Sequence, residues 1–154
     1  MAQNTHTRLI LAVATTAVML LTTAGPAAAS VDDSFGTSSN IPSGCSNPNT
    51  PAAYAEFVDY GPGDPGNSAN NDDYVTLTDM CGDGVGVQVN VGLNGVWLGG
   101  KYNGLGHGKT VYFDPFPNGN VKGGDGISLQ VCSRNGPWAQ AYNCAFYDSV
   151  SIDG

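Results

Sequence analysis

Strict alternation of apolar with small or polar residues over positions 85–93 is the feature that most limits how this chain can fold. Successive side chains of a β-strand point to opposite faces, so the run VGVQVNVGL predicts a strand with one face in the core and the other in solvent. Asn94-Gly95 follows at once and predicts a tight hairpin turn, because both residues tolerate positive φ. The residues expected to face the core are Val85, Val87, Val89, Val91 and Leu93.

Further strands are predicted on both sides of this hairpin. Turn-forming Gly, Pro, Asn and Asp separate the apolar stretches, and no stretch beyond the first thirty residues has helical periodicity. About seven strands predict an all-β fold, namely an antiparallel two-sheet sandwich with an immunoglobulin-like outline. A jelly roll or a small barrel is the alternative. The predicted strands cover residues 53–60, 73–80, 85–93, 96–102, 110–113, 127–132 and 138–147.

The first 29 residues differ in composition from the rest of the chain. Arg8 precedes thirteen uncharged, mostly apolar residues, and the small residues Ala27-Ala28-Ala29 follow a Gly-Pro pair. The apolar run is shorter than the roughly 20 residues that a membrane helix needs. This order predicts a signal peptide over residues 1–29, with cleavage after Ala29 and secretion of a product that has no membrane anchor. Residues 30–52 are expected to form an extended N-terminal arm, and residues 53–154 a single sandwich domain.

The expected mature chain is strongly acidic, with four basic and thirteen acidic residues and a formal charge of −9. Proteins bind phosphate backbones and anionic membranes through clustered Lys and Arg, so neither nucleic acid nor a membrane surface is expected as a partner. A neutral polysaccharide or another extracellular protein is the expected partner of a monomer.

Four cysteines follow the leader, and an oxidising extracellular environment predicts that they form two disulfides. Cys132 and Cys144 flank one predicted hairpin, so the preferred pairing is Cys45–Cys81 with Cys132–Cys144. Strict alternation places the two hairpin cysteines out of phase, so this pairing requires a bulge in the longer return strand. The alternative joins Cys81 to Cys132 between the sheets.

No catalytic residues and no cofactor are predicted. His107, the one histidine beyond the leader, lies in a glycine-rich loop that offers little of the rigid support a catalytic base needs. Glu56 is the only glutamate, whereas glycoside hydrolysis requires two carboxylates. The chain is therefore expected not to be an enzyme. The alternatives are a secreted inhibitor or toxin-like effector, acting through an exposed loop at 61–72 or 103–109, and a small extracellular hydrolase.

A loop rich in oxygen ligands is the one candidate for a metal. Calcium prefers carboxylate and amide oxygens, but the regular D-x-D-x-D-G spacing is absent, so no metal is otherwise expected. The candidate calcium ligands are Asp64, Asn70, Asp72 and Asp73.

Aromatic residues predicted to face outward are the remaining candidates for a binding site. Strand parity places Val96 and Leu98 inward and turns Trp97 outward, where a Trp side chain can stack on a sugar ring or anchor a protein partner. Tyr102 lies five residues further on, so a bulge near Gly99-Gly100 is needed to bring it to the same face.

The expected function is that of a secreted non-catalytic protein, either a binding module or an extracellular structural component. The alternative to exposed aromatic side chains is that the N-terminal arm covers both Trp97 and Trp138. The candidate ligand-binding residues are Trp97, Tyr102, Asn94 and Asn103.

Two segments carry a resemblance to known proteins. DDYVTLTDMCGDGVGVQVNVGLNG at 72–95 and GDGISLQVC at 124–132 resemble small exported proteins of filamentous, Streptomyces-type actinobacteria, and the Ala/Thr-rich leader is similar to theirs. The resemblance covers most of residues 70–145. It implies a secreted β-rich protein of unknown function and no active-site residues.

Overall fold

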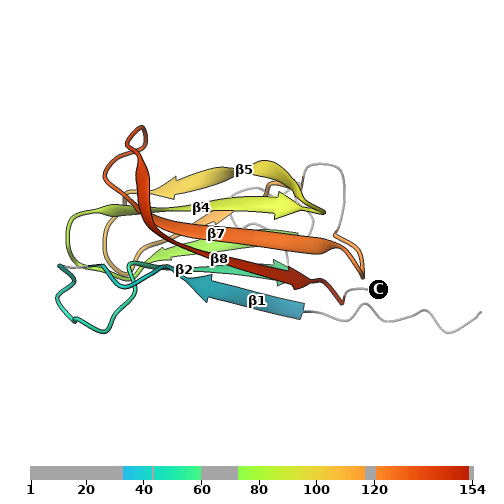
Figure 1. The fold of residues 1–154 in the computed structure, drawn as a ribbon, viewed down its shortest axis with the longest axis horizontal. Helices are drawn as coiled ribbons and strands as arrows, with labels where there is room; N and C mark the ends of the chain where they lie inside the picture. Colours follow the sequence, from blue (N-terminus) through green and yellow to red (C-terminus); the bar gives the residue numbers. More distant parts are fainter. Residues whose placement is uncertain (1–32, 43, 60–72, 117–120, 153–154) are drawn as a thin grey trace, which may run out of the picture.

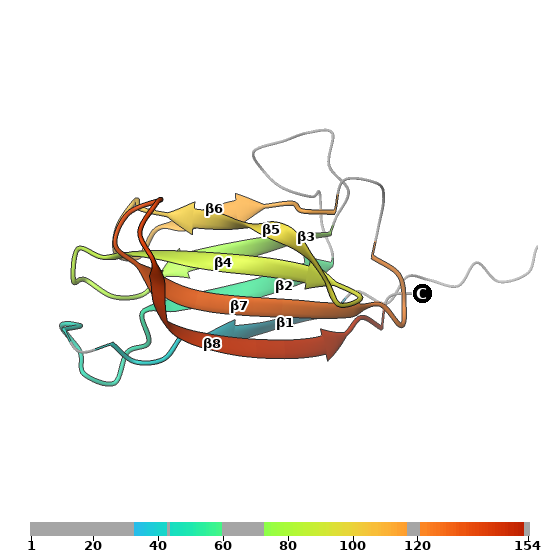
Figure 2. The same cartoon turned by 45° about the horizontal axis from the view of Figure 1, so that its top comes forward.

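The computed structural model describes residues 33–42, 44–59, 73–116 and 121–152, which form eight strands and no helix. Two antiparallel four-stranded sheets, ordered β1-β2-β3-β6 and β5-β4-β7-β8, pack face to face (Figures 1 and 2). The strands are β1 (Asp33–Ser38), β2 (Ala53–Asp59), β3 (Asp73–Asp79), β4 (Gly86–Leu93), β5 (Val96–Asn103), β6 (Thr110–Phe113), β7 (Gly126–Arg134) and β8 (Ala141–Val150).

The topology confirms the predicted sandwich. The chain passes from one sheet to the other after β3, after β5 and after β6, so that β7 pairs with β4 rather than with β6. With β1 set aside, β2-β3-β6 facing β5-β4-β7-β8 follows the order of immunoglobulin-like domains. The two sheets share no hydrogen-bonded ladder among the described residues, so the fold is not a closed barrel.

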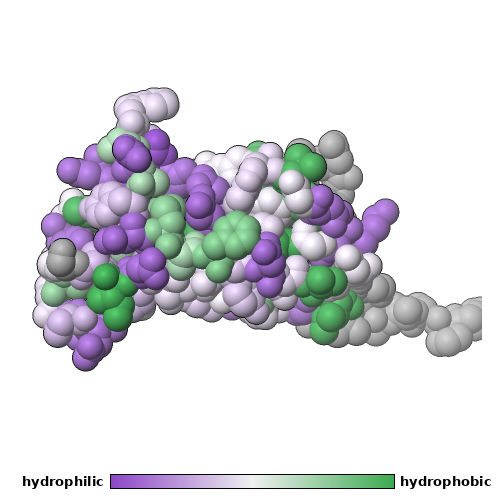
Figure 3. Space-filling model, in the orientation of Figure 1, coloured by the Kyte–Doolittle hydropathy of each residue, from purple (hydrophilic) through white to green (hydrophobic). Residues whose placement is uncertain are grey.

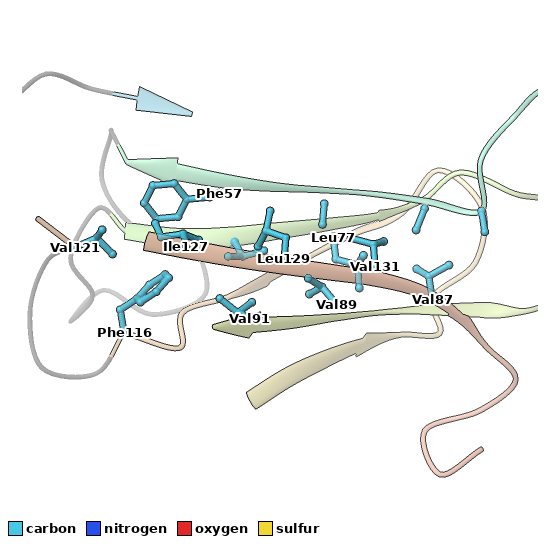
Figure 4. Packing of buried hydrophobic residues seen from close by; sticks show 14 of the residues in the cluster. Phe57, Leu77, Val87, Val89, Val91, Phe116, Val121, Ile127, Leu129 and Val131 are labelled. Atoms are coloured by element: carbon cyan, nitrogen blue, oxygen red, sulfur yellow. The ribbon is translucent and has the colours of Figure 1, made fainter. Parts of the chain in front are cut away.

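Inward side chains of both sheets form one core (Figure 4). The alternation in β4 has the predicted result, since its valines are buried while Gln88 and Asn90 are half-buried on the outer face. Burying each large aliphatic side chain contributes about 1.5–3 kcal/mol, so the facing rows supply much of the stability. The largest core residues are Phe57, Val75, Leu77, Val87, Val89, Val91, Phe116, Ile127, Leu129 and Val131.

Part of the predicted N-terminal arm is an eighth strand. β1 pairs antiparallel with β2 at the edge of its sheet. The Phe35 ring packs against Phe57, with the ring centroids 5.1 Å apart. The sequence of this segment does not alternate between apolar and polar residues, because Phe35 is the single large apolar residue that β1 contributes to the core.

Both disulfides have the preferred pairing. Cys45–Cys81 ties the segment after β1 to the end of β3, and Cys132–Cys144 joins β7 to β8. The predicted bulge is present in β8. Val131 pairs with Ala145 and Ser133 with Tyr142, so two residues of β8 face Cys132 alone. The bulge therefore brings Cys144 opposite Cys132.

The first half of β5 departs from the prediction. Val96 is 63 % exposed and Leu98 is also exposed, although parity placed both inward. β6 ends at Phe113, and a side chain at Gly99 would begin 3.8 Å from the Phe113 ring. Phe113 is the last residue of β6, so β6 extends along β5 no further than Gly99 and leaves the residues before Gly99 uncovered. Alternation reports which residues share a face, not whether another sheet covers that face.

Candidate functional site

The outer surface of the β5-β4-β7-β8 sheet combines aromatic and amide side chains. Cross-strand register aligns Trp97 with Gly92, Ser128 and Asp148 in one row. The next row contains Gly100, Asn90, Gln130 and Phe146, and the third contains Tyr102 and Gln88. We call the set formed by Gln88, Asn90, Trp97, Tyr102, Gln130 and Phe146 the aromatic–amide face. Apolar groups bordered by hydrophilic ones are visible over β7 and β8 in Figure 3.

A bulge in β5 places Trp97 and Tyr102 on the same side of the sheet. Gly92 pairs with Trp97 and Val91 with Gly99, so Leu98 is the extra residue. Gly92 and Gln88, the partners of Trp97 and Tyr102, are four residues apart on β4 and point the same way. The structure thus contains the required bulge, directly before Gly99.

Two of the three aromatic rings of the face, those of Trp97 and Phe146, meet above the middle of the sheet. Trp97 and Phe146 come from its two edge strands, yet their ring centroids are 6.0 Å apart with an interplanar angle of 74°. Small residues between them make room, since a Cβ at Gly92 would lie 3.5 Å from Trp97 Cε3 and 3.3 Å from Ser128 Cβ. Trp97 is 52 % exposed and Phe146 54 %, so both rings remain accessible.

A chain of hydrogen bonds links the amides of the face. Arg134 donates to Gln88 Oε1, Gln88 Nε2 donates to Asn90 Oδ1 at 2.6 Å, and Asn90 Nδ2 donates to Gln130 Oε1 at 2.9 Å. A guanidinium can only donate, so Arg134 fixes which end of Gln88 is oxygen and thereby the direction of the whole chain. The last amide, Gln130, accepts at Oε1 and keeps Nε2 for another acceptor.

A shallow depression of about 320 Å³ lies between the aromatic and amide groups. Gly100 lines it without a side chain, and a Cβ there would meet Asn90 Oδ1 and lie 2.6 Å from the Val89 carbonyl oxygen. The depression therefore offers an indole ring on one side and amide groups on the other. It is lined by Asn90, Trp97, Gly99, Gly100 and Gln130.

The other candidate binding residues have different positions. Tyr102 is half-buried, and its ring lies against Gly86 and Gly104, where any side chain would collide with it. Asn94 is exposed in the β4–β5 turn, where its amide contacts Asp125 and the Gly126 backbone. Asn103 is fully buried, so the structure does not bring it to the outer face.

Neither tryptophan is covered by the described part of the N-terminal arm. Trp138 is 93 % exposed in the connection between β7 and β8 and belongs to no ring pair among the described residues. The structure therefore separates the two tryptophans, with Trp97 in the aromatic–amide face and Trp138 outside it.

Of the calcium candidates, Asp64, Asn70 and Asp72 lie outside the described residues. Asp73 is fully buried, and its Oδ2 accepts a hydrogen bond from the Val121 backbone N–H. Register places it on the inner face in one row with Asp59 and Asp33, an alignment that only the strand pairing reveals. The one close group of three potential ligands in the described segments is Cys45, Cys81 and Asp83, and its two cysteines form a disulfide.

The two residues considered for catalysis, His107 and Glu56, belong to different elements, the β5–β6 loop and β2. His107 is exposed and lines a cavity of about 290 Å³ beside the Cys45–Cys81 disulfide. Glu56 lies on the outer face of the other sheet, where its cross-strand neighbours Gly36 and Thr76 are not acidic. Burial raises the pKa of Asp79, which lies at the rim of the sandwich.

Comparison of the chain with protein-family models, with curated proteins and with solved structures finds no match. Within residues 33–152, in the segments that the structure describes, no helix is long and apolar enough to cross a membrane. The two disulfides are compatible with an extracellular location.

Proposed function

We propose that this protein is a secreted, non-catalytic binding protein that holds a neutral polysaccharide on its aromatic–amide face. One observation carries the proposal: the accessible Trp97 ring lies beside the amides of Asn90 and Gln130 around one depression. A sugar ring presents an apolar C–H face and a polar rim of hydroxyl groups. An aromatic ring next to fixed amides is complementary to both.

Charge supports a neutral rather than an anionic ligand. The expected mature chain has a formal charge of −9, which repels polyanions at long range. Arg134, a cation bordering the face, directs its guanidinium at Gln88 Oε1 and the Ala139 carbonyl. The face therefore presents neutral hydrogen-bonding groups to a ligand.

Location supports the same class of function. The predicted leader and the two disulfides favour export, and insoluble polysaccharides are abundant outside cells. The resemblance to exported actinobacterial proteins suggests the kind of organism that produces the protein, but it implies no particular activity.

Retention on insoluble chitin, cellulose and purified cell wall tests this proposal. Wild-type protein is expected to be retained on at least one of them, and Trp97→Ala to bind about tenfold more weakly because the stacking surface is lost. Trp138→Ala is the matched control, since it removes an exposed indole outside the face, and should bind like wild type. No retention of wild type, or equal retention of all three proteins, would contradict the proposal.

A further inference from the structure

We infer that the aromatic–amide face selects glycans whose sugars carry N-acetyl groups over glycans that carry only hydroxyl groups. This inference rests on the proposed function and names the ligand class. It is carried by the direction of the amide chain that ends at Gln130.

The end of that chain is a hydrogen-bond donor. Because Arg134 cannot accept, every amide in the chain donates its N–H to the next oxygen, and the chain ends at the NH₂ group of the half-buried Gln130. The side-chain hydrogen bond that the structure gives Gln130 among the described residues uses its Oε1 as acceptor from Asn90, not its Nε2. A charged donor at the start of the chain also polarises the amides that follow it, which strengthens this terminal donor.

An acetamido group matches this donor and its surroundings. Its carbonyl oxygen is a strong acceptor that can be placed on Gln130 Nε2, and its methyl group needs an apolar contact. The Trp97 and Phe146 rings supply that contact, since Trp97 lines the same depression and Phe146 is the cross-strand neighbour of Gln130. A hydroxyl group at the same position has no methyl group to bury and accepts more weakly.

Other strong acceptors fit the molecule less well. A carboxylate or sulfate on the glycan would accept from Gln130 Nε2, but the expected formal charge of −9 opposes the approach of polyanions. Asp148 stands in the adjacent row, hydrogen-bonded to Ser128, and adds negative charge close to the rings. Charge complementarity therefore leaves the neutral acetamido group as the acceptor.

The test compares soluble tetramers of β-1,4-linked N-acetylglucosamine and of β-1,4-linked glucose by titration calorimetry. One hydrogen bond and one methyl contact are expected to give about tenfold tighter binding of the acetylated tetramer. Gln130→Glu keeps an oxygen that accepts from Asn90, but it replaces the NH₂ donor with a carboxylate oxygen and adds one negative charge. Because both tetramers are uncharged, the substitution should bring their two affinities close together.

Each outcome separates the inference from the proposed function. Equal binding of both tetramers by wild type would overturn the selection and leave glycan binding intact. A tenfold preference that persists in Gln130→Glu would show that Gln130 does not read the acetamido group. Failure of wild type to bind either tetramer or any insoluble polysaccharide would overturn the proposed function itself.

Discussion

At the scale of single residues, the Asn103 side chain joins elements that the backbone ladders leave apart. Its Nδ2 donates to the Leu77 carbonyl at 3.1 Å and to the Lys109 carbonyl at 2.8 Å, while Oδ1 accepts from the Leu105 N–H at 3.0 Å. It thereby connects the end of β5 to β3 in the opposite sheet and to the loop before β6. A buried amide that makes three hydrogen bonds has a structural role, although the sequence alone made Asn103 a candidate for ligand binding.

Replacing Asn103 by Ala is expected to lower the free energy of unfolding by about 2–4 kcal/mol, because two carbonyls and one N–H lose their buried partner. Urea denaturation monitored by fluorescence measures the change. Asn135→Ala, in an exposed turn, is the control and should shift stability by less than about 0.5 kcal/mol. Equal effects of the two substitutions would contradict the structural role.

Asp79 is expected to make the stability of the fold depend on pH, and the direction of that dependence follows from its pKa. Burial raises the pKa of its carboxyl group, the nearby Asp83 raises it further, and the Cys81 N–H and His107 lower it. A raised folded-state pKa means that the folded protein binds the proton more tightly than the unfolded chain. Stability from Asp79 is therefore full below the ordinary Asp pKa of about 3.9 and is lost as pH rises through the raised value.

Asp79→Asn keeps an oxygen for the Cys81 N–H and removes the charge, so it should be more stable than wild type at neutral pH. The difference between the two proteins is expected to shrink toward about pH 3, where the wild-type carboxyl is protonated. Denaturation midpoints at several pH values provide the measurement. A difference that does not change with pH would contradict burial as the dominant cause.

At the scale of elements, the β4–β5 hairpin positions the binding face through its glycines and its bulge. Gly100→Ala would place a Cβ 2.6 Å from the Val89 carbonyl and against Asn90 Oδ1. Relief requires movement of both strands and of the amide chain, at a cost of about 1–3 kcal/mol. We expect a lower thermal midpoint together with weaker glycan binding. A variant with wild-type stability and affinity would show that the close packing of β4 against β5 is dispensable.

The two disulfides stabilise different connections. Loop-closure entropy gives about 3 kcal/mol for the separation of 12 residues in Cys132–Cys144 and about 4 kcal/mol for the separation of 36 in Cys45–Cys81. In urea denaturation, replacing Cys45 and Cys81 by Ala should therefore lower the free energy of unfolding more than replacing Cys132 and Cys144 by Ala. The opposite order would mean that local packing around Cys132, rather than loop length, decides their contributions.

The sequence correctly predicted strands whose own side chains alternate between apolar and polar. It missed features that depend on contacts with neighbouring strands. The valines of β4 and the Asn94-Gly95 turn fixed one hairpin, because local periodicity and turn chemistry suffice there. β1 was missed, since pairing with β2 and one ring contact of Phe35 make it a strand. Trp97 was placed outward correctly, but the amide chain depends on cross-strand register, which no single segment encodes.

At the scale of the whole molecule, the start of β1 bears on the predicted processing site. Cleavage after Ala29 would leave three residues ahead of Asp33, the first residue of β1, and so preserve its pairing with β2. We expect intact-mass measurement of protein from culture supernatant to give an N-terminus at Ser30. A start well before residue 27, or recovery only in the membrane fraction, would contradict the predicted leader.

The sandwich also separates its surfaces by chemistry. The outer face of β2-β3-β6 has the Tyr74–Tyr112 ring pair and a Thr78–Thr110 hydrogen bond, whereas the opposite outer face has the amide chain and Trp97. A ligand bound to the face that contains Trp97 should leave the Tyr74–Tyr112 face unchanged. Residues of the Tyr74–Tyr112 face can therefore serve as the reference in a binding measurement.

The chain contains two tryptophans, and this makes the central claim directly measurable. In a ¹⁵N-resolved NMR titration with the N-acetylglucosamine tetramer, each indole N–H gives its own signal. The account predicts that the Trp97 indole and the Gln130 amide signals shift with one shared dissociation constant, while the Trp138 indole does not move. A titration in which Trp138 shifts and Trp97 does not, or in which no signal of the aromatic–amide face responds, would contradict it.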